Sequence, residues 1–195
     1  MFITLEGIDR SGKTTQARLL ADAIGALLVR EPGGTDAGER IRELLADPGI
    51  ELDPVSELLL FGAARAELVR REIRPALDAG RDVVCDRFTD STLAYQGAAR
   101  GLGTEPVERL NRIATGGLAP DLTLLLRIDP EPAGVREGDG GDRFESEGLE
   151  LQAAVAAAYD EIARNDPDRV VVVDAGRGVD AVHADVIAAV ERSRP

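Results

Sequence analysis

Lysine is almost absent from this chain, in which 23 basic side chains comprise one lysine, Lys13, and 22 arginines. Cysteine and histidine also occur once each, as Cys85 and His183, and tryptophan does not occur. A single cysteine excludes an internal disulfide. The lone histidine lies far along the chain from every motif described below, so we expect a structural role for it rather than a catalytic one.

Positive charge is also in short supply, since acidic residues outnumber basic ones and the net charge is −13. Long-range repulsion opposes binding to nucleic acids and to anionic membranes, so we expect neither partner. No N-terminal apolar stretch is long enough for a signal peptide or a membrane helix, which predicts a cytoplasmic protein. Any binding of phosphate groups must therefore depend on arginines gathered locally.

The one lysine stands in a segment that fills every position of the phosphate-loop pattern G-x-x-x-x-G-K-[ST]. In such a loop, glycines let backbone N–H groups point at an anion, and the following helix adds its positive N-terminal end. A compact ammonium follows the β and γ oxygens of a nucleoside triphosphate, and a hydroxyl binds Mg²⁺. The predicted nucleotide-binding residues are Gly7, Ile8, Asp9, Arg10, Ser11, Gly12, Lys13 and Thr14.

Apolar runs typical of strands alternate with helical patterns along the chain. Their near-continuous apolar character predicts a parallel sheet that is buried on both faces, and hence an α/β protein. With 195 residues, the chain is long enough for one well-buried core, so we expect one domain. The expected strands cover residues 2–6, 26–29, 82–85, 122–128 and 170–173.

Three helical patterns are expected to supply core faces, and one segment is not. Residues 54–79 read as helical, residues 151–162 and 179–190 each carry an apolar stripe, and residues 136–142 are glycine-rich and polar. The last segment predicts a mobile loop, either a lid that closes over phosphates or a plain turn. The stripe expected within 54–79 consists of Val55, Leu58, Leu59, Gly62 and Ala66.

The end of the third expected strand separates the classes of phosphate-loop protein. A guanine-nucleotide switch needs a second lysine for its Asn-Lys-x-Asp motif, and this chain has none. A motor ATPase typically ends a buried strand with Asp-Glu, whereas here Asp86 is followed by Arg87. An arginine in this place favours the phosphate of an acceptor substrate over a water molecule, although a structural Asp-Arg pair is the alternative.

An ordered set of motifs across nearly the whole chain resembles the thymidylate kinases, which phosphorylate dTMP to dTDP with MgATP. The Glu-Pro-Gly-Gly-Thr element within this set is typical of bacterial members. The motifs are Leu5–Gln16, Arg30–Thr35, Phe61–Arg65, Asp86–Phe88, Ser91–Gly97, Pro120–Leu124 and Asp142–Glu145. The resemblance implies a three-layer P-loop kinase fold with a five-stranded parallel sheet flanked by helices, a single domain over 1–195 with a mobile lid at about 134–145, and a homodimer.

The resemblance also assigns roles on the acceptor side. Phe61 would stack on the thymine ring, and Arg65 would donate to a base carbonyl. The alternatives from the residues alone are a plain core role for Phe61 and a solvated helix face for Arg65. The remaining implied residues are Thr92 and Gln96 at the pyrimidine edge, Tyr95 against the sugar, Arg87 on the monophosphate, and Asp9 near the sugar hydroxyl or the acceptor phosphate.

On the donor side, the resemblance implies that Thr14 binds Mg²⁺ directly and that Asp86 holds waters on the ion. Many bacterial relatives place a small residue at the position of Arg10 and carry extra arginines in the lid. This chain has Arg10 and also offers Arg136 and Arg143 in the lid. We predict that Arg10 bridges the two phosphates, with Lys13 and Arg136 as further catalytic groups and Arg143 on the ATP side.

Other features leave choices open. The segment Asp174–Gly178 is a candidate to cover the adenine, but a plain strand-to-helix turn explains it almost as well. A kinase for another nucleoside monophosphate and a nucleotide-binding regulator without transfer activity are the two rival functions. The acceptor residues Arg65 and Arg87 argue against the regulator, which would need only the ATP site.

Overall fold

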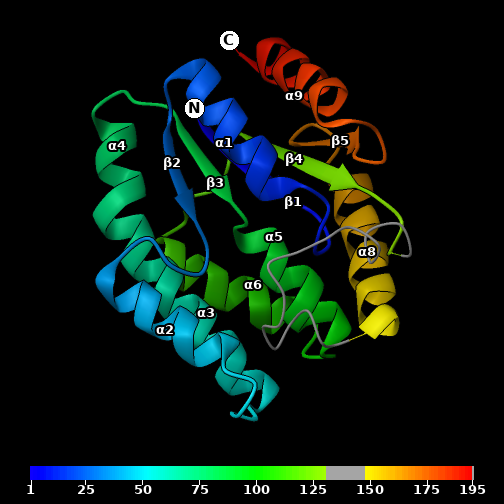
Figure 1. The fold of residues 1–195 in the computed structure, drawn as a ribbon. Helices are drawn as coiled ribbons and strands as arrows, with labels where there is room; N and C mark the ends of the chain where they lie inside the picture. The colour runs from blue at the N-terminus through cyan, green and yellow to red at the C-terminus, as the bar shows by residue number, and fades with distance from the viewer. Residues whose placement is uncertain (131–147, 195) are drawn as a thin grey trace.

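Five parallel strands form the centre of the computed structural model, which describes residues 1–130 and 148–194 (Figure 1). The sheet has the order β2-β3-β1-β4-β5. All five predicted strands are confirmed, with ends shifted by one residue at most, and so is the parallel α/β architecture. The strands are β1 Phe2–Glu6, β2 Leu27–Arg30, β3 Val83–Asp86, β4 Leu122–Arg127 and β5 Val170–Asp174.

Helices cover both faces of this sheet and give the three-layer arrangement visible in Figure 1. Helices α1 and α9 pack on one face, and α4 and α8 pack on the other. The helices are α1 Lys13–Ile24, α2 Asp36–Ala46, α3 Pro54–Leu68, α4 Arg74–Asp78, α5 Thr89–Thr92, α6 Thr104–Thr115, α8 Gly148–Asn165 and α9 Val179–Ser193, with π-helical segments η1 Val69–Ile73 and η2 Leu93–Ala99.

The strand order places two of the sequence motifs beside each other. Strand β1 pairs with β3, and Leu5 lies opposite Asp86 in that register. Because the strands are parallel, the loop after β1 and the Asp86-Arg87 turn after β3 leave the sheet at the same edge. Ligands of open α/β sheets bind in the crevice at this carboxyl edge. The phosphate loop and the acidic strand end therefore face a common site.

The stripe expected on residues 54–79 is wrong in part. Helix α3 leaves Val55 and Leu59 about half exposed, at 50% and 53%. Glu57 and Arg65 are each 1% exposed instead. Glu57 and Arg65 can lie inside because each has charged and amide partners there. The helix face that carries Val55 and Leu59 is therefore turned toward the solvent.

The two C-terminal stripes are largely confirmed. Val155 and Tyr159 of α8 are buried, as are Val182 and Val190 of α9, whereas Val179 at the start of α9 is half exposed. No helix in the described ranges is long and apolar enough to cross a membrane. The predicted lid at about 134–145, with Arg136 and Arg143, lies outside the described residues.

Candidate active site

The phosphate loop connects β1 to α1, and its backbone requires glycine at both predicted positions. Gly7 has φ 142° and Gly12 has φ 93°, both in the region that side chains rarely adopt. A Cβ on Gly7 would lie only 2.6 Å from the carbonyl oxygen of Leu126. Arg10 also has a positive φ of 61°. The loop thus has the tight, irregular path of an anion cradle at a helix N-terminus.

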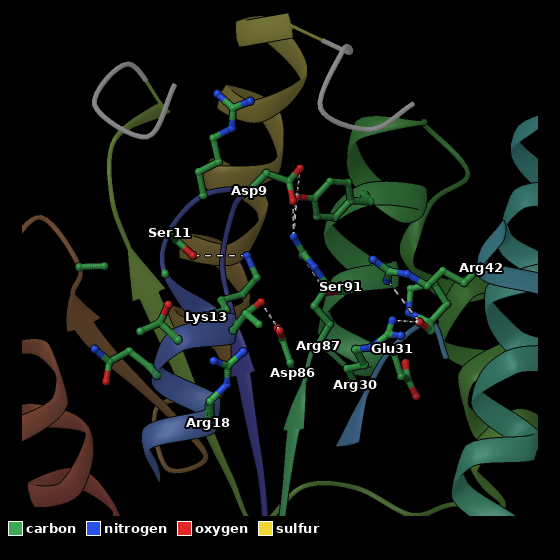
Figure 2. A pocket seen from close by; sticks show the side chains of 18 of the residues that line it. Asp9, Ser11, Lys13, Arg18, Arg30, Glu31, Arg42, Asp86, Arg87 and Ser91 are labelled. Carbon is green, nitrogen blue, oxygen red and sulfur yellow. Dashed lines mark hydrogen bonds and ion pairs between the residues drawn. The ribbon is translucent and has the colours of Figure 1, made fainter. Parts of the chain in front are cut away.

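Lys13 is folded into this loop and 6% exposed. Its Nζ donates to the carbonyl oxygen of Ile8 at 2.6 Å and to Ser11 Oγ at 3.3 Å, and Figure 2 shows it between Ser11 and Asp86. Burial, and then the charge of Arg87, lower the pKa of Lys13 to about 8. The ammonium is therefore charged at neutral pH and held by the loop into which phosphates would enter.

Thr14 and Asp86 form the candidate magnesium site. The Thr14 hydroxyl donates to Asp86 Oδ2 at 2.6 Å, whereas Asp86 Oδ1 is buried and has no hydrogen-bond partner among the described residues. A hydroxyl and a carboxylate at the start of a helix are the hard oxygen ligands that Mg²⁺ takes in phosphate-loop proteins. The unsatisfied carboxylate oxygen fits an ion or its bound water.

Arg87 lies at the centre of the site in a strained backbone conformation, with φ 70°. Its guanidinium pairs with Asp9 (Figure 2). It also donates to the carbonyl oxygen of Gly7 and to Ser91 Oγ, each at 3.2 Å. The predicted alternative of a structural pair within Asp86-Arg87 is therefore not what the structure has. Instead, Arg87 spans from the β3 turn to the phosphate loop.

Asp9 is the counterion of this arginine. Burial would raise its pKa, but the charges of Arg87 and Lys13 outweigh burial, so the pKa of Asp9 is lowered. The Tyr95 hydroxyl donates to Asp9 Oδ2 at 3.1 Å, and Gln152 Nε2 donates to the same oxygen at 2.8 Å. Asp9 thus remains ionised and joins the phosphate loop, η2 and α8.

These groups line one cavity of about 960 Å³. It extends from the loop before α9 to α3 and η2, and Arg18, Arg30 and Arg42 line it as well. Seven basic side chains line it against three acidic ones, in a protein whose net charge is −13. They are Arg10, Lys13, Arg18, Arg30, Arg42, Arg87 and Arg177, against Asp9, Glu31 and Asp86. Arginines are thus gathered locally at this cavity, as phosphate binding in an acidic protein would require, and the binding itself stays a prediction.

Four of the five other predicted acceptor residues also line the cavity: Phe61 from α3, Thr92 from α5, and Tyr95 and Gln96 from η2. The fifth, Arg65, does not. Turns of α3 and η2 that are distant in sequence bring the four side chains together. They form an end of the cavity with an aromatic ring beside a hydroxyl and an amide, which is suitable for a flat polar base.

Arg65 lies behind the cavity wall because protein groups take its donors. Its Nε donates to Glu31 Oε2 at 2.8 Å, and its Nη1 donates to Asn111 Oδ1 at 2.6 Å and to Thr92 Oγ1 at 3.1 Å. Its Nη2 donates to the carbonyl oxygen of Phe88 at 2.8 Å. With 1% exposure, Arg65 is not the solvated helix residue of the alternative interpretation. Its contact with a base carbonyl stays a prediction.

Several residues that support the site were not predicted. Glu6, at the end of β1, accepts from the backbone N–H of Phe88 at 2.7 Å and from Ser91 Oγ at 2.6 Å. Its pKa is raised because it is buried and because Asp90 lies nearby. No periodicity marks such residues, although Glu6 and Glu31 lie within the quoted motifs. The others are Glu31, Glu57, Asn111 and Gln152.

The far end of the cavity corresponds to the segment considered for adenine. Ala175, Arg177 and Gly178 line the cavity there, together with Val179 at the start of α9. Gln16 of α1 lines it too and donates from Nε2 to the carbonyl oxygen of Val179 at 2.9 Å. The segment therefore borders the same cavity as the phosphate loop, as a base-covering element would.

Comparisons with known proteins agree with this site. The family model described as thymidylate kinase matches residues 5–186. A thymidylate kinase of Deinococcus radiodurans is 45% identical over 197 residues, covering 97% of this chain and 96% of that protein. One of Synechococcus sp. (strain JA-3-3Ab) is 50% identical over 181 residues, covering 90% and 88%.

A solved structure shows the same fold. The crystal structure of thymidylate kinase from Ehrlichia chaffeensis superposes with a TM-score of 0.83 at 35% identity, covering 97% of this chain and 98% of that one. The match therefore spans nearly the whole of both chains. With the phosphate loop, the Asp86-Arg87 turn and the acceptor residues on one cavity, the chain belongs to the thymidylate kinase family, whose members are ATP-dependent nucleoside monophosphate kinases.

Proposed function

We propose that this member of the family transfers the γ-phosphate of MgATP to dTMP and releases dTDP and ADP. The observation that carries the proposal is the cavity itself, which joins a phosphate loop to an aromatic and polar acceptor end and gathers seven basic side chains in an acidic protein. Two polyanionic nucleotides fit such a cavity. A mere ATP sensor would need neither Arg87 nor the acceptor end.

The transfer step needs alignment and charge neutralisation rather than covalent help. An oxygen of the dTMP phosphate attacks the γ-phosphorus, and the bond from that phosphorus to the β–γ bridging oxygen breaks, leaving its electron pair on ADP. The attacking oxygen already carries charge, so no general base is required. Lys13 neutralises the β and γ oxygens, while Arg87, fixed by Asp9, holds the acceptor phosphate in line.

Thr14 would bind Mg²⁺ directly and Asp86 would hold waters on it, which fits the hydroxyl and the unsatisfied Oδ1. When bound there, the ion would supply positive charge that offsets the charge of the donor phosphates. On the acceptor side, Phe61 would stack on the thymine ring, Thr92 and Gln96 would read its edge, and Tyr95 would lie against the sugar. Arg65 donates to Thr92 from behind the wall, and its contact with a base carbonyl rests on the family resemblance.

Further catalytic charge would come from arginines. Arg10 lines the cavity within the phosphate loop, so we place it between the donor and acceptor phosphates. Arg136 is a secondary catalytic group and Arg143 a group on the ATP side; both rest on the family resemblance, because they lie outside the described residues. Neutralising a phosphoryl group in this way is typically worth a hundredfold or so in rate.

We also propose that the chain is a single cytoplasmic kinase domain that assembles as a homodimer. Val55 and Leu59 of α3 leave an apolar surface about half exposed, and Ile113 of α6, a helix that packs against α3, is 79% exposed. Burying such side chains against a second copy would stabilise a dimer.

The proposal is tested by ADP release from MgATP with dTMP, dUMP, the ribose form of TMP, dCMP, dAMP and dGMP offered in parallel. Turnover highest with dTMP is the expected result. A different preferred acceptor would reassign the base pocket, and ATP binding without any acceptor-dependent turnover would overturn the kinase activity itself.

A further inference from the structure

The Gln96 side chain is an amide built into the acceptor end of the cavity. It is 2% exposed and lines the cavity from η2. Its Nε2 donates to Glu57 Oε1 at 2.8 Å. In the part of the chain that the structure describes, its Oε1 has no hydrogen-bond partner. One end of the amide is therefore bound to the protein, and the other end is left for a ligand.

Glu57 determines which way the Gln96 amide group is oriented. An ionised carboxylate only accepts hydrogen bonds, so Gln96 must turn its NH₂ group toward Glu57 and its carbonyl oxygen away. The reversed amide would place two acceptors against each other inside the protein, which is costly. The orientation of the Gln96 amide thus follows from the chemistry of the pair.

Glu57 is itself firmly held. It is 1% exposed, and Arg100 donates to both of its carboxylate oxygens, each at 3.3 Å. The ion pair compensates the buried negative charge. Glu57 lies four residues before Phe61 on α3, so both side chains lie on the same helical face. The proposed ring-stacking residue and the residue that orients Gln96 are therefore carried by one rigid helix.

We infer that Glu57 is a positioning residue that makes the acceptor site select bases with an N3–H donor, such as thymine and uracil, over cytosine. The inference rests on the proposed function, in which Gln96 reads the pyrimidine edge. The imide N3–H of thymine donates to Gln96 Oε1. Cytosine has an unprotonated N3 with a lone pair, so two acceptors would face each other and cytosine is rejected by repulsion.

The test is the isosteric variant Glu57→Gln, assayed with dTMP, dUMP and dCMP. An amide at position 57 both donates and accepts, so it no longer dictates the orientation of Gln96. We expect the dTMP to dCMP ratio of kcat/KM to fall by about tenfold or more. The dTMP to dUMP ratio should stay within about twofold, because both bases carry the N3–H. A general loosening of the pocket would change the second ratio too.

Asp90→Asn is the matched control, since Asp90 is also a buried carboxylate paired with an arginine, Arg169, at 2.8 Å, but its hydrogen bonds go to Arg169 and not to Gln96. It should leave the dTMP to dCMP ratio unchanged. An unchanged ratio in a folded Glu57→Gln variant would overturn the inference. The native enzyme distinguishes failure of the proposed function from failure of this inference. A native enzyme that does not prefer dTMP would contradict the proposed function, whatever the Glu57→Gln variant does.

If the Glu57→Gln variant does not fold, a crystal structure of the native chain with bound dTMP tests the inference instead. Gln96 still bonded to Glu57, with its other amide atom within hydrogen-bond distance of thymine N3, supports the inference. A Gln96 side chain that leaves Glu57 when dTMP binds, or that does not reach N3, overturns it.

Discussion

Arg65 and Glu31 form a buried ion pair inside the wall of the cavity, with Arg65 Nη2 2.6 Å from Glu31 Oε2 and side-chain exposures of 1% and 3%. The pair ties α3 to the segment that follows β2. Through the same guanidinium it also reaches Thr92 and Asn111. The wall of the acceptor end is thus stabilised by polar contacts whose partners come from four separate segments.

Arg65→Ala should therefore destabilise the protein strongly. It leaves the Glu31 carboxylate and the Asn111 carbonyl buried without their donor, and breaking a buried pair in this way costs about 3 to 5 kcal/mol. Urea denaturation measures the loss. Arg127→Ala removes the exposed pair with Asp160 and should cost far less. Equal losses in the two variants would contradict the structural role of Arg65.

Glu31 should make stability depend on pH. Burial outweighs Arg65 and raises the pKa of Glu31 from 4.5 to about 7. Because the folded state holds the proton more tightly, this contribution is complete below about pH 4.5 and is lost as the pH rises through about 7. Unfolding free energies of the native chain and Glu31→Gln should diverge by up to about 3 kcal/mol across this window. Parallel pH profiles would rule this out.

Lys13 should make ATP binding weaker at alkaline pH. Its pKa is lowered to about 8, so the ammonium is lost as the pH rises through that value. ATP affinity should weaken between about pH 7 and pH 9, by at most about tenfold per pH unit. The stability of the ligand-free protein should change in the opposite direction. Because folding lowers the pKa of Lys13 from 10.5 to about 8, the free energy of unfolding should rise as the pH rises between these two values.

Affinity for dTMP is the internal control for this measurement, because Arg87 remains charged over the whole range. Titration calorimetry at several pH values would report both ligands. ATP affinity that is flat while dTMP affinity falls would exclude the assigned roles of Lys13 and Arg87.

Arg10→Ala should lower kcat by about a hundredfold while changing dTMP affinity little, since its contact is proposed for the transition state. Arg136→Ala should have a smaller effect on turnover. Steady-state kinetics of the two variants side by side make the comparison. A larger loss in Arg136→Ala would reverse the assignment.

Leu59→Glu should separate the proposed dimer into monomers, because a charge on the half-exposed surface of α3 cannot be buried without a partner. Analytical ultracentrifugation gives the mass. Val172→Glu, at a similarly exposed position on the edge strand β5, should leave the dimer intact. A native chain that is monomeric at all concentrations would disprove the assembly.

Most of the fold could be predicted from the sequence because the patterns that indicate it lie within short segments. Five apolar runs and the Gly7–Thr14 loop predict strands and a strand-loop-helix unit from nearest neighbours alone, and the structure agrees. The error lay on α3, where hydrophobicity suggested that Val55 and Leu59 face inward. Burial of Glu57 and Arg65 depends on partners distant in sequence, and a periodicity argument does not include such pairings.

The part of the site that could be predicted consists of the residues that face the cavity, because these residues make up the sequence motifs. Phe61, Arg87, Thr92, Tyr95 and Gln96 all line the cavity. The residues behind them were not predictable, because a supporting carboxylate is recognised only by what it contacts. Nothing in the spacing of Gln152 or Glu57 distinguishes them from the other acidic and amide residues of this acidic chain, and Glu6 is marked only by its place in the Leu5–Gln16 motif.

The most direct test of the proposed phosphoryl transfer is the fate of labelled phosphate when the native chain is incubated with γ-³²P-labelled MgATP and dTMP. We expect label in dTDP, in a one-to-one ratio with the ADP formed, and almost none in free phosphate. Label that appears only as inorganic phosphate, or that stays entirely on ATP, would contradict this activity.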